Sequence, residues 1–390
     1  MKKLLLICVV VWSLPGPLPV CAQSTVSDVL NFLVTNQSIP TGSVERDRAA
    51  AQATSDTIAR MLRTNLATLP VSTSSGGFVY RLDPNLGTME RQSASFGPIF
   101  VERSAGAGRG AASVGLTIQH MRFDSLDGRD LRNGSLVTTA NQFADETQPF
   151  DVDRLTLAID ADVATLHANL GLSDDAEFGA ALPLVALRVD GTRLNTYRGR
   201  SFTQARASAR AIGVADLLLH FKQTAFRGEG AALAAAADVR LPTGRERDLL
   251  GAGSASVRIS AIGSMERRRL SADANVGLTM GGLAREWNYS GALAAAVTAR
   301  MTWTAEIVGR WMDSPGAIGE VALPHPTLVG VRTIRLLPGS TGTRMTFFSP
   351  GLKVNVSDTW VLVANVMVPL TKGGLTAPFT PLVGFDYGLQ

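Results

Sequence analysis

The strongest constraint on the fold is a two-residue alternation of apolar and polar side chains that recurs along the chain after Gly76. Between Leu270 and Met280 every second residue is apolar, and Ser271, Asp273 and Asn275 stand among the residues between them. Side chains of a β-strand point alternately to its two faces, so such a run predicts a strand with one apolar face. Strands of soluble proteins most often have about 5–6 residues, whereas a tilted strand that crosses a bilayer needs about 9–11, as in this run.

The same alternation occurs at residues 155–163, 231–241, 303–311 and 383–389. In each run we expect the apolar face, for example Leu155, Leu157 and Ile159, to face lipid, with the intervening side chains in an enclosed lumen. In hydrocarbon every backbone N–H and C=O must be paired, and strands achieve this only in a closed sheet. The sequence therefore predicts an all-β fold, a transmembrane antiparallel β-barrel.

The composition excludes several other classes of protein. Of the 390 residues, 45% are hydrophobic and 18% are charged. No stretch after the N-terminus holds 18 consecutive apolar residues, so a multi-span helical membrane protein is excluded. The net charge is +4 and the longest basic block is 267–269, so no nucleic-acid partner is expected. A soluble exported β protein stays open as an alternative.

Twelve strands account best for the spacing of the runs. They are expected near residues 112–123, 155–171, 177–189, 213–226, 230–241, 253–265, 268–280, 288–300, 302–312, 345–356, 359–370 and 381–389. The connections then alternate between short turns and long loops, as in bacterial barrels with short periplasmic turns. A fourteen-strand alternative adds a first hairpin from 78–83 and 96–103. We expect residues 328–337 to form a hairpin within an outer loop.

The N-terminal region divides into two predicted parts. Residues 1–22 have a basic start, an apolar run and a small-residue cleavage site after Ala22, which is typical of a signal peptide. Residues 23–96 are expected to form a helical plug or a periplasmic segment, followed by a barrel at 97–390. In the predicted helix over 44–69, an apolar stripe that includes Ile58, Met61 and Leu62 recurs at helical spacing. Such a stripe packs against the barrel or binds a periplasmic partner.

The sequence contains no recognisable catalytic or cofactor motif. The four histidines lack metal-ligand spacing, and neither a G-x-S-x-G elbow nor a Walker A or dinucleotide fingerprint occurs. We therefore expect no enzyme activity, no cofactor and no metal. Cys8 and Cys21 are the only cysteines, and both precede the predicted cleavage site.

Charged and polar residues on the strands are predicted to line the lumen. They are Asp160, Asp162, Asp216, His220, Lys222, Asp238, Arg240, Arg258, Asp273, Asn275, Glu306 and Arg310. Because both signs of charge are present, we expect ion pairs across the lumen, whereas an ion-selective pore carries mainly one sign.

Several segments resemble a family of bacterial outer-membrane proteins grouped as transporters of the meta-pathway of phenol degradation. The matching segments are Ser95–Arg103 (SFGPIFVER), 123–128 with Asp130 and Leu131, 213–219 (GVADLLL), 239–254 (VRLPTGRERDLLGAGS), and 349–356 with Trp360, Pro369 and Leu370. The resemblance implies a plugged channel in the cell outer membrane for passive uptake of small hydrophobic or aromatic compounds. A barrel that serves as an anchor, or as a partner-binding or secretion component, stays open as the second function.

Aromatic residues make up only 6% of the chain, although outer-membrane barrels carry aromatic girdles at both membrane interfaces. Eight residues can supply a thin girdle: Trp287, Tyr289, Trp303, Trp311, Trp360, Phe379, Phe385 and Tyr387.

Overall fold

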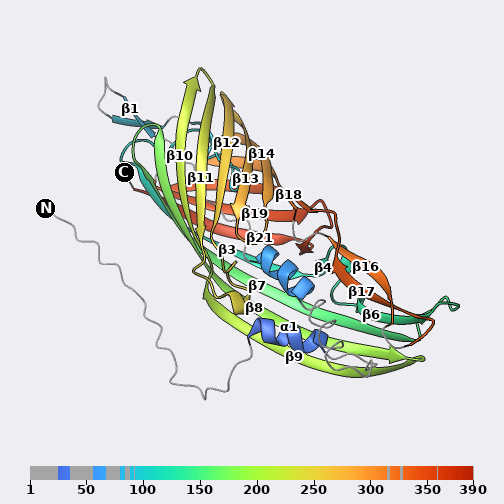
Figure 1. Cartoon of the computed structure of the whole chain (residues 1–390). Coiled ribbons are helices and arrows are strands. Elements are labelled where there is room, and N and C mark those ends of the chain that lie inside the picture. Colours follow the sequence, from blue (N-terminus) through green and yellow to red (C-terminus); the bar gives the residue numbers. More distant parts are fainter. Residues whose placement is uncertain are drawn as a thin grey trace, which may run out of the picture.

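Twelve antiparallel strands close into a barrel in the computed structural model of the chain (Figure 1). The structure describes residues 25–35, 56–66, 80–83, 88–91, 93–313, 317–325, 328–357 and 359–389. The predicted signal peptide at 1–22 lies outside the described residues.

The barrel strands are β3 (Ala112–Phe123), β7 (Asp151–Gly171), β8 (Ala176–Tyr197), β10 (Leu217–Gly228), β11 (Ala231–Leu241), β12 (Ser256–Arg267), β13 (Leu270–Gly281), β14 (Glu286–Thr298), β15 (Met301–Met312), β18 (Thr343–Ser357), β19 (Trp360–Pro369) and β21 (Thr380–Leu389). Each pairs with the next, and β21 pairs with β3 to close the ring. The twelve-strand prediction is confirmed, and β3 has the predicted bounds.

Six strands form a sheet that continues beyond the barrel at one end. Its order is β16 (Ile318–Pro324), β17 (Val331–Pro338), β6 (Leu136–Phe143), β7, β8 and β9 (Arg200–Val214). β7 and β8 have 21 and 22 residues, so each contributes to both the barrel and this sheet. We call the sheet the extension and the opposite end of the barrel, where the short turns lie, the turn end (Figure 1).

Two predictions about the loops and the strand number are wrong. Residues 190–212 were expected to form a loop, but β8 and β9 pair continuously there. The outer face of this hairpin carries polar side chains, so it lacks the apolar face by which membrane strands were identified. The fourteen-strand alternative also fails, because β1 (Tyr80–Asp83) pairs only with β2 (Thr88–Arg91), and 96–103 form no strand.

The remaining elements are short or belong to the loops. The predicted outer-loop hairpin begins earlier than expected, because β17 pairs with β16 and also joins β6. The short strands β4 (Ser125–Leu126), β5 (Arg129–Asp130) and β20 (Leu375–Thr376) form a small sheet, and η1 (Glu246–Asp248) is a 3-10 helix.

Two helices pack against the inner face of the extension. They are α1 (Val26–Thr35) and a helix over 56–66. Ile58, Met61, Leu62 and Leu66 are all buried, so the predicted stripe is a packing face. Arg63 pairs with Glu246 of η1. Among the described residues, no helix is both long enough and apolar enough to span a membrane.

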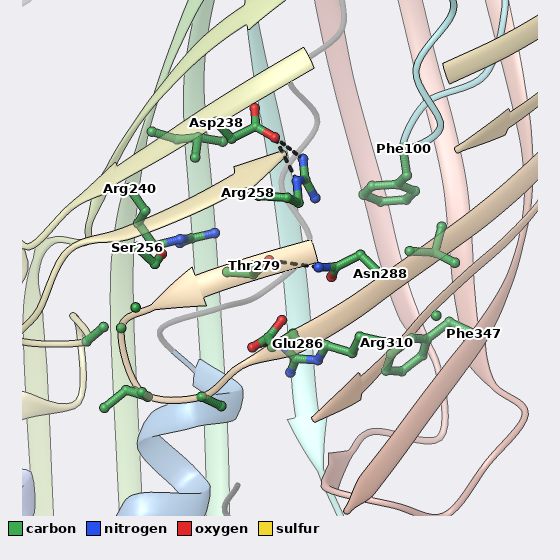
Figure 2. A pocket seen from close by; sticks show the side chains of 18 residues that line it. Phe100, Asp238, Arg240, Ser256, Arg258, Thr279, Glu286, Asn288, Arg310 and Phe347 are labelled. Atoms are coloured by element: carbon green, nitrogen blue, oxygen red, sulfur yellow. Dashed lines mark hydrogen bonds and ion pairs between the residues drawn. The ribbon is translucent and has the colours of Figure 1, made fainter. Parts of the chain in front are cut away.

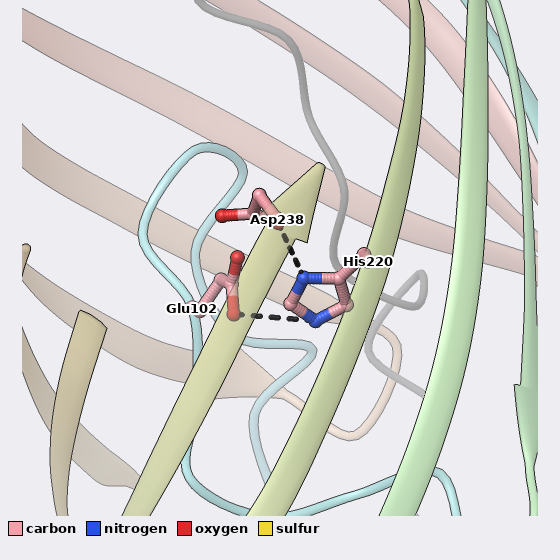
Figure 3. A group of neighbouring side chains, drawn as sticks. All are labelled: Glu102, His220 and Asp238. Atoms are coloured by element: carbon pink, nitrogen blue, oxygen red, sulfur yellow. Dashed lines mark hydrogen bonds and ion pairs between the residues drawn. The ribbon is translucent and has the colours of Figure 1, made fainter. Parts of the chain in front are cut away.

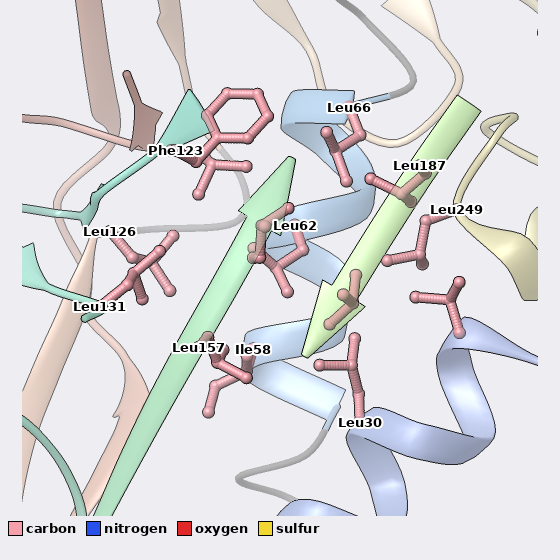
Figure 4. Packing of buried hydrophobic residues seen from close by; sticks show 14 of the residues in the cluster. Leu30, Ile58, Leu62, Leu66, Phe123, Leu126, Leu131, Leu157, Leu187 and Leu249 are labelled. Atoms are coloured by element: carbon pink, nitrogen blue, oxygen red, sulfur yellow. The ribbon is translucent and has the colours of Figure 1, made fainter. Parts of the chain in front are cut away.

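The apolar face of β7 changes sides along the strand. Leu155, Leu157 and Ile159 point inward and join the helices in one buried cluster (Figure 4). Nearer the turn end, Leu166 and Leu170 are exposed on the outer face. The prediction that residues 155–159 face lipid is therefore wrong, because the helices provide apolar contacts inside this part of the structure.

The outer face of the barrel is apolar and has aromatic residues at two levels. Trp303 and Trp311 lie on the same exposed face of β15. Eight residues cover roughly 26 Å along a strand, or about 20 Å of height at a tilt of about 40°. Trp287 is paired with Trp311 at one level, and the ring of Trp360 lies 5.3 Å from that of Phe385 near the turn end. This spacing matches the apolar band of a membrane barrel, about 25 Å tall.

Candidate functional site

The barrel lumen contains residues 93–107, which we call the inner segment. The first barrel strand begins only at Ala112, so the predicted domain boundary at residue 97 falls within this interior stretch. The inner segment makes hydrogen bonds to side chains of β8, β10, β12, β13, β15 and β18. It therefore narrows the half of the lumen nearer the turn end.

A buried carboxylate on β15 holds the middle of the inner segment. The backbone N–H groups of Ile99, Phe100 and Val101 donate to Glu306 at 2.6, 2.8 and 3.0 Å. Consecutive N–H groups that point to one side form a concave anion site, and bonds to an ionised acceptor are stronger than neutral ones. The Nζ of Lys353 donates to the carbonyl of Pro98 at 2.7 Å. The charged side chains of Glu306 on β15 and Lys353 on β18 thus both bind the backbone of the inner segment.

A second group of charges joins the inner segment to β10 and β11 (Figure 3) and also includes Arg258 of β12 (Figure 2). The Nδ1 of His220 lies 2.7 Å from the Asp238 carboxylate, and its Nε2 lies 3.5 Å from Glu102 of the inner segment. The Nε of Arg258 donates to Asp238 at 2.6 Å. Glu102, His220 and Asp238 offer three potential metal-ligand atoms within 4.8 Å of one another. However, the Arg258 guanidinium already supplies a cation to both carboxylates, at 2.6 and 4.0 Å, so the donor set fits an ion-pair cluster better than a metal ion.

The ends of the inner segment are attached by polar side chains as well. The hydroxyl of Ser93 donates to Glu266 at 2.8 Å, and that of Thr224 donates to the carbonyl of Ser104 at 2.7 Å. The N–H of Ala107 donates to Glu177 at 2.9 Å. These contacts attach both ends of the inner segment to β8, β10 and β12.

The structure places ten of the twelve predicted lumen residues toward the interior, where they are buried or half-buried. Nine lie on the inner faces of their strands: His220, Lys222, Asp238, Arg240, Arg258, Asp273, Asn275, Glu306 and Arg310. Asp216 is buried in the connection between β9 and β10. His220, Asp238 and Arg258 come together in one cluster. Arg310 lies 3.8 Å from Glu286. Asp216 instead accepts from the backbone of Gly244 and Ala252 in the loop after β11.

Asp160 and Asp162 are not in the lumen, and their prediction is wrong. They alternate with the inward Ile159 and Ala161, so they lie on the outer face of the sheet. The Asp162 carboxylate accepts a hydrogen bond from Nδ1 of the exposed His120 at 2.7 Å. The error follows from assigning the apolar side of β7 to lipid along its full length.

Sequence reasoning missed several of the residues that hold or form the inner segment. Glu102 was named only within the matching segment Ser95–Arg103, and its place in the lumen was not foreseen. Glu177 and Lys353 also escaped notice, although both lie on predicted strands. The signal that could have found them is their position on the polar side of the alternation, opposite outward residues such as Phe178 and Leu352.

A cavity of about 130 Å³ lies between the inner segment and the extension end of the barrel (Figure 2). Phe100 and Phe347 form part of its apolar wall. Arg240, Arg258 and Arg310 also line it, together with the carboxylates of Asp238 and Glu286. An engineered cavity of about 150 Å³ in another protein holds one benzene ring, so this space corresponds to about one aromatic ring.

Comparison with known proteins gives similarity to solved barrels only. The COG4313 outer-membrane channel from Pseudomonas putida F1 aligns over 73% of this chain and 98% of its own, with 16% identity and a TM-score of 0.48. The KdgM porin in complex with disordered oligogalacturonate (62% of this chain and 99% of its own, 7% identity, TM-score 0.36) and the NanC porin (70% and 100%, 5% identity, 0.38) align less well. No family model and no curated protein matches the sequence. The barrel fold is established by the strand pairing of this chain itself.

Proposed function

We propose that this chain is an outer-membrane channel through which small aromatic acids diffuse passively. The observation that carries the proposal is the cavity, which combines two phenyl rings with three arginines inside a closed barrel. The chain's exposed apolar belt and its two levels of aromatic residues support a membrane location. In this placement the short turns face the periplasm and the extension projects outward.

The chemistry of the cavity favours aromatic acids among the hydrophobic and aromatic compounds that such a channel could admit. Arg240, Arg258 and Arg310 bring three positive charges, against the two carboxylates of Asp238 and Glu286. A planar carboxylate is the group that a guanidinium binds with two parallel hydrogen bonds. An aromatic acid supplies both the ring and the carboxylate, whereas an alkane offers no hydrogen-bond acceptor to a guanidinium.

The inner segment fits a channel of narrow bore. It occupies the lumen beside the cavity, and its Phe100 lines the cavity wall. A solute as small as benzoate then passes a constriction lined by polar groups, and larger solutes are excluded by size.

The structure gives less support to the two alternative functions. A periplasmic partner would need the apolar stripe predicted within residues 44–69, but Ile58, Met61 and Leu62 of the helix over 56–66 are buried against the extension. The same packing places this helix away from the turn end. A soluble exported protein would not leave such a large belt of Leu, Ile, Val and Trp side chains exposed.

Uptake into liposomes tests the proposal. We expect the full chain to admit labelled benzoate faster than octanoate or octane. Arg240→Gln should lower benzoate uptake about tenfold, because it removes one charged hydrogen bond of at least about 1.4 kcal/mol. Arg206→Gln, on the exposed outer face of β9, is the matched control and should leave uptake unchanged. If none of the three solutes permeates, with or without residues 23–107, the proposal is wrong.

A further inference from the structure

The outer surface of the extension carries a row of charged residues in direct register. Arg122 of β3 is paired with Asp160 of β7, Asp160 with Arg188 of β8, and Arg188 with Arg210 of β9. All four side chains point to the outer face, opposite the buried core. Neighbouring strands lie about 4.8 Å apart, so the row is roughly 14 Å wide.

The charged row lies beyond the apolar belt, on the side away from the turn end. Four residues nearer the turn end on each strand, the register row is Ile118, Ala164, Leu184 and Val214. Ile118 and Leu184 are each 48% exposed, as lipid-facing residues are. Four residues correspond to about 13 Å along a strand. The charged row therefore lies where the headgroups begin if the apolar row lies in hydrocarbon.

Two arginines in this row, Arg188 and Arg210, face each other directly across β8 and β9. Arg188 also lies opposite Asp160 in register, but the carboxylate of Asp160 forms its ion pairs with other arginines. Asp160 lies 3.3 Å from Arg132 and 4.0 Å from Arg122. Among the described residues, no ion pair within 4.0 Å involves Arg188 or Arg210. Like charges directly opposite each other across two strands are destabilising, so an anion that binds both would relieve this repulsion.

We infer that Arg188 and Arg210 bind the phosphate groups of a phosphorylated glycolipid in the outer leaflet, with its acyl chains against the apolar row. Arginine is well suited to this role because its guanidinium binds phosphate with two parallel hydrogen bonds. The continuity of charged and apolar rows favours a lipid, which presents both chemistries at once, over free phosphate. The inference rests on the membrane placement in the proposed function but not on transport.

Lipid binding to the purified full chain in neutral detergent tests the inference. Native mass spectrometry and a titration with diphosphoryl lipid A should show a bound lipid. The double variant Arg188→Gln with Arg210→Gln should weaken this binding about 30-fold, since each basic residue near an anionic surface contributes about 1 kcal/mol. Arg268→Gln with Arg269→Gln, which removes the same charge from an exposed turn at the other end, should change it less than about twofold.

Three further results decide the outcome. Lipid A without its phosphates and phosphatidylcholine should bind no better to the native chain than to the double variant. Inorganic phosphate at millimolar concentration should not displace the lipid; if it does so fully, the site binds free phosphate and the inference fails. Equal lipid binding by the native chain and a folded double variant also overturns it. Benzoate uptake by the double variant should stay normal, which separates this test from that of the channel.

Discussion

Removing the carboxylate of Glu306 should open the channel. Its two oxygens accept three backbone hydrogen bonds from residues 99–101, at 2.6 to 3.0 Å, and the side chain is fully buried. In Glu306→Ala all three N–H groups lose their partner. At about 1–1.5 kcal/mol for each bond, because water replaces part of the loss, docking of the inner segment weakens by about 3–4 kcal/mol. That shifts the equilibrium toward an undocked segment by several hundredfold.

Conductance in planar bilayers measures this effect. We expect Glu306→Ala to show a larger and more variable conductance than the native chain. Glu306→Gln should lie between the two, because the amide keeps one acceptor oxygen but turns its NH₂ group toward a backbone donor. Asp386→Asn is the matched control: it alters a buried carboxylate that pairs with His167 in the barrel wall at 2.7 Å. A native conductance in folded Glu306→Ala would refute the reasoning that these bonds hold the segment in place.

Two further predictions concern the helices. Gly191→Ala places a Cβ against the side chain of Leu33, so α1 should be displaced and its packing free energy should weaken by about 1–3 kcal/mol. Hydrogen exchange of the α1 amides should therefore be faster in this variant, whereas Gly263→Ala, the control, should leave it unchanged. The Thr25 hydroxyl donates to Asp28 at 2.7 Å and keeps the pKa of that carboxyl below its ordinary value. This Thr25–Asp28 interaction caps the N-terminus of α1. It should be intact at neutral pH and be lost as the pH falls through the lowered pKa of Asp28. The first α1 amides should then lose protection from hydrogen exchange between pH 7 and pH 2, and unchanged protection would show that the cap contributes nothing.

The barrel itself could be predicted because the membrane imposes a simple rule on its strands. In β13 the apolar residues from Leu270 to Met280 point outward, and Asp273 points inward, as the alternation predicts. The same rule holds for β11 and β15, which contact lumen on one side and the outer belt on the other. The number of strands could also be predicted, because short turns separate consecutive alternating runs and mark where one strand ends and the next begins.

The rule fails where a strand leaves the membrane. Along β7 the alternation continues unbroken, but Leu157 packs on the helices and Leu166 faces outward. Alternation states which residues share a face; it does not state what that face contacts. For the same reason, β9 escaped detection, since Arg206 and Arg210 occupy its outer face and only small alanines occupy the inner one.

The inner segment could not be predicted from periodicity because it has no regular structure. Its position depends on hydrogen bonds from the backbone N–H groups of residues 99–101 to one carboxylate of β15. Backbone N–H groups carry no sequence information. The alternation placed Glu306 in the lumen correctly, but from the sequence we expected a charged side chain, and not a backbone segment, as its partner. A segment bound through its backbone leaves almost no pattern in its own side chains.

The two interior parts of the chain are held by different balances of apolar and polar contacts, and this difference indicates which of them can move. The helices are held by a large apolar cluster that includes Leu62 and Leu30, and exposing a side chain of this size to water costs about 1.5–3 kcal/mol. The inner segment has a smaller apolar cluster, in which Phe96 and Ile99 pack against the barrel wall, and is otherwise held by hydrogen bonds to residues such as Glu306 and Thr302. Water can replace these bonds at a net cost of about 1 kcal/mol each. Opening of the channel should therefore begin at the inner segment beside the cavity, while the helices under the extension stay in place.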